Sequence, residues 1–180
     1  MSVRILTATL MALLMLAGCM SPPVNRNPAA ALASVASVDL ERYTGRWFEV
    51  ARFPNSFEEN CVGVTATYSK NADGTVKVVN RCRLSTLDGK ESVAEGSARV
   101  VDTASNAKLA VTFFWPFEGD YWVIALDADY KWALVGEPSG RYLWILSRTP
   151  KLSDDVRTDL LKRLEGFGYN TKALYWTPQG

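Results

Sequence analysis

The sequence predicts an all-β protein, an eight-stranded antiparallel up-and-down barrel followed by one C-terminal α-helix and a short final strand. Three observations support this fold class. From residue 45 onward, short segments alternate apolar and polar residues, which is typical of strands with one face in a core. Gly, Asn, Asp and Pro separate these segments at near-regular spacing, as turns do. One later segment, 153–168, has helical spacing instead.

The strand pattern repeats along most of the chain. The predicted strands are 45–53, 62–70, 75–83, 91–101, 107–115, 119–127, 130–137 and 142–148. Eight antiparallel strands of this length can close into a barrel that holds one small ligand.

The helix after the last barrel strand has clear end signals. Ser153 is an N-cap candidate, and Asp154 lies in the first turn, where the helix dipole favours acidic groups. Gly166 is placed to end the helix. The apolar residues at helical spacing are Val156, Leu160, Leu161 and Leu164. The segment 172–176 then has the character of a short final strand.

The N-terminal segment is expected to lie outside the barrel domain of residues 38–180. Residues 1–18 combine one early basic residue with an apolar run that is too short for a permanent membrane span, which indicates a secretory signal peptide. The run ends in Leu-Ala-Gly before Cys19 and resembles a bacterial lipoprotein signal, which implies cleavage before Cys19 and acylation of this residue. An ordinary signal peptide with an incidental cysteine is the alternative. Residues 19–37, rich in Ala, Ser, Pro and Asn, are predicted to form a flexible tether.

The composition limits the possible functions. The chain contains no histidine, so Ser-His-Asp and Cys-His catalytic sites are excluded and zinc loses its commonest ligand. A formal net charge of +1 without a basic stripe gives no indication of nucleic-acid binding. We therefore expect no catalytic residues, no metal site and no cofactor. The 20 aromatic residues instead suit an apolar cavity with rigid walls.

One motif carries a resemblance to a known family. Gly45-Arg46-Trp47 opens a strand after a short helical turn at 38–43, and Arg148 ends the eighth predicted strand in Leu-Trp-Ile-Leu-Ser-Arg-Thr-Pro. This arrangement resembles the lipocalins, and the last segment resembles their bacterial branch. The resemblance implies that Arg148 stacks on Trp47 at the closed end of the barrel and donates to carbonyls of the 39–43 turn. With the lipoprotein signal, it points to an outer-membrane lipocalin.

Alternation along the strands predicts which residues line the cavity. Small residues share one face of the strand from 91, and Lys131 is expected to face water, which places its neighbours inward. A buried Glu49 would need a hydrogen-bonding partner or a polar ligand group. A register error of one residue would reverse each assignment. The predicted ligand-binding residues are Glu49, Phe53, Val78, Ala98, Tyr130, Trp132, Tyr142 and Trp144.

Two cysteines remain besides Cys19. Cys61 and Cys82 lie on two strands joined by the turn at 71–74, so hairpin pairing brings them close together, and we expect a disulfide in an oxidising compartment. The alternative is a free reactive thiol, which would keep a catalytic function open.

The sequence therefore predicts a binding protein and not an enzyme. Its expected ligand is a long-chain fatty acid or a lysophospholipid, and the resemblance implies storage or transport on the periplasmic side of the outer membrane in a Gram-negative bacterium. A scaffold protein with a filled cavity and an enzyme with a lipophilic substrate are the alternatives. The sequence leaves open three roles for the aromatic segment 113–117: a cavity rim, a homodimer surface or a membrane-contacting patch.

Overall fold

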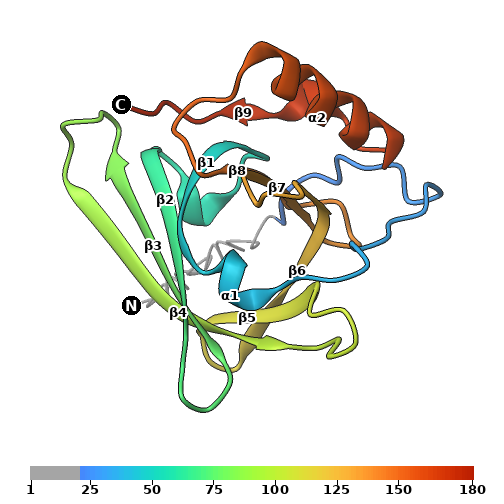
Figure 1. The fold of residues 1–180 in the computed structure, drawn as a ribbon. Coiled ribbons are helices and arrows are strands. Elements are labelled where there is room, and N and C mark those ends of the chain that lie inside the picture. Colours follow the sequence, from blue (N-terminus) through green and yellow to red (C-terminus); the bar gives the residue numbers. More distant parts are fainter. Residues whose placement is uncertain (1–20) are drawn as a thin grey trace, which may run out of the picture.

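The computed structural model describes residues 21–180 as a closed β-barrel with one helix on its outside (Figure 1). The predicted signal peptide, 1–18, and Cys19 lie outside the described residues. A short helix α1 (Leu40–Tyr43) precedes the first strand. The barrel strands are β1 (Gly45–Arg52), β2 (Cys61–Lys70), β3 (Val76–Leu84), β4 (Glu91–Val100), β5 (Lys108–Phe114), β6 (Phe117–Leu126), β7 (Trp132–Gly136) and β8 (Leu143–Ser147).

The eight strands form an antiparallel meander that closes on itself. Each strand pairs with the next, and β1 completes the ring by pairing with both β8 and β2. Trp47 is paired with Ala66 of β2, and Phe48 with Ser147 of β8. A ninth strand, β9 (Tyr175–Trp176), pairs with the far end of β1. The predicted fold class is confirmed, with strand ends within a few residues of those expected.

Two apolar cores lie on opposite sides of the barrel wall. One fills the closed end of the barrel interior around Trp47, which is fully buried. The other lies between the outer wall and α2 (Asp154–Gly166), whose Leu160 and Leu164 are fully buried. The Ser153 side chain accepts a hydrogen bond from the Val156 amide, which confirms the predicted N-cap. Within residues 21–180, no helix is long and apolar enough to cross a membrane.

The segment before the barrel, predicted as a flexible tether over 19–37, contacts the barrel in its described part. Its described part, 21–37, runs over the barrel surface (blue in Figure 1). The Asn25 amide donates to the Gly140 carbonyl at 2.9 Å. The buried Arg26 guanidinium donates to carbonyls near the end of α2 and within its own segment. These contacts attach the segment to the barrel because they satisfy main-chain groups on both sides.

Candidate ligand-binding site

A cavity of about 670 Å³ occupies the barrel interior toward the end where β4 and β6 begin. The volume is within the range of small-molecule sites. Most of its wall is apolar and comes from β2, β3, β4, β5, β6 and β8; representative lining residues are Val64, Ala66, Val78, Val111, Phe113 and Leu146. The side chains at its mouth include the exposed Phe57, Phe114 and Phe117, so the cavity opens at this end. Below, we call it the open end.

Five of the eight predicted ligand-binding residues border empty space inside the barrel. Glu49, Val78, Tyr142 and Trp144 line the large cavity. Ala98 borders a smaller void of about 20 Å³ nearer the closed end. The alternation used for β3, β4 and β8 therefore agrees with the structure.

Phe53 was predicted to face inward and does not. Glu49 is paired with Leu146, but the next paired residue is Ala51 with Ile145, so the β1–β8 ladder contains a bulge. A bulge inserts one residue and reverses the face of every residue after it. The Phe53 ring consequently joins the outer core beneath α2.

Trp132 was also assigned to the wrong face, whereas Tyr130 belongs to the interior core but does not line the cavity. The interior residues of β7 are Ala133 and Val135, whereas Trp132 packs in the outer core beside α2. Tyr130 lies in the turn before β7 with a φ of 61°. Because alternation holds only in extended backbone, it could not be carried from Tyr130 into the strand. Tyr130 instead closes the barrel floor, where its hydroxyl accepts a hydrogen bond from the Asp39 amide at 2.8 Å.

Arg148 seals the closed end as the motif implied. Its guanidinium lies 3.8 Å from the centroid of the Trp47 ring, within the range of a cation–π contact. The same guanidinium donates hydrogen bonds to the carbonyls of Arg42, Tyr43, Thr44, Arg46 and Tyr130. One side chain thus joins α1, the start of β1 and the turn before β7.

A tyrosine cluster forms the base of the large cavity. The Tyr121 hydroxyl lies 2.8 Å from that of Tyr43 and 3.0 Å from that of Tyr68. Burial raises the pKa of Tyr68 to about 12 and raises the pKa values of Tyr43 and Tyr121 well above the usual 10. The three hydroxyls therefore stay neutral and satisfy one another, so the base of the cavity carries no charge.

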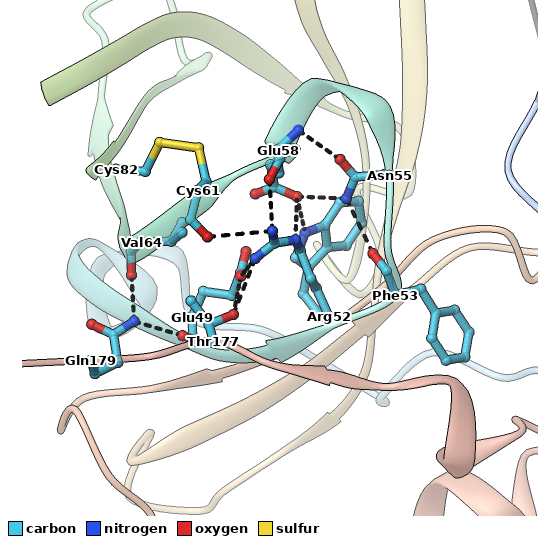
Figure 2. A network of polar contacts seen from close by, with 11 residues as sticks. Glu49, Arg52, Phe53, Asn55, Glu58, Cys61, Val64, Cys82, Thr177 and Gln179 are labelled. Carbon is cyan, nitrogen blue, oxygen red and sulfur yellow. Dashed lines mark hydrogen bonds and ion pairs between the residues drawn. A yellow bond between two sulfur atoms is a disulfide. The ribbon is translucent and has the colours of Figure 1, made fainter. Parts of the chain in front are cut away.

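The wall near the mouth contains a buried charged cluster (Figure 2). The Arg52 guanidinium donates to the Glu49 carboxylate at 2.6 Å, and its Nε lies 3.8 Å from the Glu58 carboxylate. Burial, and then the nearby Glu58 charge, raise the pKa of Glu49 from 4.5 to about 8. Two carboxylates thus share one guanidinium, and Glu49 retains its proton at neutral pH.

Neighbouring side chains hold this cluster in place. The Trp144 indole donates to Glu58 at 3.1 Å, and the Asn55 amide donates to the same oxygen at 2.7 Å. The Thr177 hydroxyl donates to Glu49 (Figure 2). Glu49 and Trp144 were predicted from the sequence, but Glu58 was not. Glu58 lies on the short 3-10 helix η1 (Ser56–Glu58), where no periodic pattern indicates the direction of a side chain.

The predicted disulfide is present. Cys61 and Cys82 are bonded across β2 and β3 with a Cα–Cα distance of 5.4 Å, beside the charged cluster (Figure 2). Both line the cavity, so neither offers it a free thiol. Among residues 21–180, no group of side chains has the composition and spacing of a metal site.

Comparisons with known proteins agree with this geometry. A family model described as a lipocalin-like domain matches residues 38–179. Outer membrane lipoprotein Blc of Escherichia coli strain K12 is 39% identical over 174 residues, which cover 97% of this chain and 96% of that protein. Temperature-induced lipocalin-1 of Arabidopsis thaliana is 42% identical over 154 residues, 81% of each chain. Insecticyanin from the tobacco hornworm Manduca sexta has a TM-score of 0.67 at 20% identity, covers 83% of this chain and 85% of its own, and supports the fold alone. The chain belongs to the lipocalin family.

Proposed function

We propose that this lipocalin binds a long-chain fatty acid or a lysophospholipid and carries or stores it at the outer membrane. The observation that carries the proposal is the open cavity of about 670 Å³ with a largely apolar wall. Burial of an acyl chain there would contribute roughly 0.8 kcal/mol per methylene group. The scaffold alternative requires an interior filled by the protein's own side chains, and this free volume argues against it.

Polar groups at the mouth suit a ligand with a polar head. Asn80 lines the cavity, and its side-chain oxygen has no hydrogen-bond partner among the residues of the described chain. A hydroxyl or amine of a ligand head group would satisfy this oxygen, because a buried acceptor without a partner is costly. Arg81 lines the same part of the cavity, where its guanidinium is already paired with the Glu91 carboxylate at 3.3 Å.

The proposed location rests on the N-terminal sequence and on the relatives. Under this proposal residues 1–18 are removed and Cys19 is acylated, so that two or more acyl chains hold the protein stably on the membrane. The name of the Blc relative, outer membrane lipoprotein, supports the same location. Metabolic labelling with palmitate would test the anchor. Label is expected on the natural chain and should be lost in Cys19→Ser.

Native mass spectrometry of residues 21–180, purified without detergent, tests ligand binding. We expect one amphiphile per protein, displaced by added palmitate or lysophospholipid. Ala94→Trp, which fills the cavity from β4, should weaken uptake by about tenfold, the effect of ~1.4 kcal/mol. Val93→Trp on the opposite face of the same strand is the matched control. A protein that is empty and takes up no added amphiphile would refute the proposal.

A second candidate function is favoured by the raised pKa of Glu49 beside the Glu58 carboxylate, since catalytic carboxylates often have raised pKa values. Arg52 and Thr177 already donate to Oε1 of Glu49, and Asn55 and Trp144 to Oε2 of Glu58, which supports a structural role. Lipid-ester hydrolysis that disappears in Glu49→Gln would instead support catalysis.

A further inference from the structure

The open end carries the most exposed large apolar side chains of the described chain. Phe114, Trp115 and Phe117 at the β5–β6 turn are 79%, 88% and 76% exposed, and Phe57 on the β1–β2 connection is 62% exposed. Every other exposed large apolar side chain of residues 21–180 is less accessible than these four. Phe57, Phe114 and Phe117 line the cavity mouth, and Trp115 lies beside them in the β5–β6 turn, so the rings form an apolar surface of a kind that usually marks a binding partner.

The barrel wall is also incomplete beside this turn. Pairing of β4 with β5 ends at Ser97 and Thr112, although β4 begins at Glu91. The unpaired part of β4 contributes Ser92 and Ala94, which line the cavity and are nevertheless exposed. The cavity therefore opens through the barrel wall, between β4 and the β5–β6 turn, as well as at the open end.

The N-terminal segment leads to the same end. The Arg141 guanidinium donates to the Pro22 carbonyl, and the Gly140 carbonyl accepts a hydrogen bond from the amide of Asn25. Both partners lie in the β7–β8 connection, which is at the open end because β7 runs toward it. Cys19 precedes Pro22 by three residues, and three residues of chain span at most about 11 Å.

We propose that the open end is a membrane-docking surface, and that single-chain lipids pass between a bilayer and the cavity through the gap between β4 and the β5–β6 turn. The inference rests on the acyl anchor of the proposed function. The short chain between Pro22 and Cys19 would hold the open end close to the membrane, and this favours a bilayer over a second copy of the chain as the partner. Phe and Trp side chains suit the interface between headgroups and acyl chains. Glu118, directly behind the turn, is paired with Arg99 through two hydrogen bonds of 2.9 and 2.6 Å, which reduces repulsion from anionic lipids.

Vesicle flotation tests the surface without the anchor. Residues 21–180, which the structure describes as one folded barrel, would be mixed with vesicles of phosphatidylethanolamine and phosphatidylglycerol. Trp115→Ser is expected to lower vesicle partitioning by about tenfold, and the triple variant Phe114→Ser, Trp115→Ser, Phe117→Ser further. Val101→Ser, an exposed apolar residue at the closed end, is the matched control and should leave partitioning unchanged.

Two readouts separate this inference from the proposed function. Trp115 does not line the cavity, so Trp115→Ser should bind an amphiphile added below its micelle concentration as the natural chain does, while its uptake from vesicles falls about tenfold. If no variant binds amphiphile, the proposed function fails, whereas flotation still decides the docking surface. Unchanged flotation in Trp115→Ser and the triple variant would overturn the inference. Loss of a dimer with unchanged flotation would also overturn it and assign the surface to a second copy.

Discussion

The two ends of the barrel are built in opposite ways. At the closed end, Arg148 covers the buried Trp47 and donates to five carbonyls, so each of these carbonyls has a protein partner. At the open end, aromatic rings such as Trp115 project into solvent, and a stretch of β4 pairs with β3 but not with β5. The comparison indicates that the closed end supplies stability. The open end has less strand pairing and burial, and this leaves an entrance to the cavity.

A matched pair of tryptophan substitutions tests this comparison with the largest expected effect. Trp47→Ala removes a fully buried ring and its cation–π contact, and should lower the free energy of unfolding by about 3–5 kcal/mol. Trp115→Ala at the open end should change it by less than about 0.5 kcal/mol. Urea denaturation of both variants measures the difference. Similar losses in the two would remove the distinction between the ends.

The disulfide is the main covalent stabiliser at the open end. Cys61→Ala combined with Cys82→Ala opens a loop of about 22 residues, and the chain-entropy model predicts a loss of about 3 kcal/mol in unfolding free energy. Amide hydrogen exchange should rise mainly in β2 and β3 near the mouth. Treatment of the natural chain with a reductant is the control and should give the same loss. An unchanged unfolding free energy in the double variant would show that the bond contributes nothing in solution.

The closed end could be predicted from the sequence, and much of the open end could not. Trp47 and Arg148 stand at fixed places in a motif, and the resemblance of that motif to the lipocalins implied their contact. Phe53 was assigned to the wrong face because a bulge in β1 has no marker in the sequence. The inward-facing residues of β7 were predicted by alternation from Tyr130, and this prediction failed because Tyr130 belongs to a turn. Glu58 was missed because it reaches the cavity from a connection, where side-chain direction depends on the tertiary structure.

The charged cluster offers the smallest and most specific test, because it is a buried titratable site near the mouth. Burial holds the pKa of Glu49 at about 8 in the folded protein, well above its usual 4.5, so the folded state binds this proton more tightly than the unfolded chain. Its contribution to stability is therefore complete below pH 4.5 and is lost as the pH rises toward 8. Unfolding free energies measured between pH 5 and 8.5 should fall by up to about 1.4 kcal/mol per pH unit from this group.

Glu49→Gln should remove that part of the slope, because the amide stays neutral and its oxygen can still accept from Arg52 and Thr177. Glu59→Gln, at an exposed neighbouring position, is the control and should keep the natural slope. A slope in Glu49→Gln equal to that of the natural chain would mean that Arg52 keeps both carboxylates ionised. In that case the mouth would carry a permanent negative charge, and a fatty-acid carboxylate would be disfavoured there relative to a zwitterionic head group. The pH profile therefore distinguishes a fatty acid from a lysophospholipid with a zwitterionic head group, whereas the cavity volume alone does not.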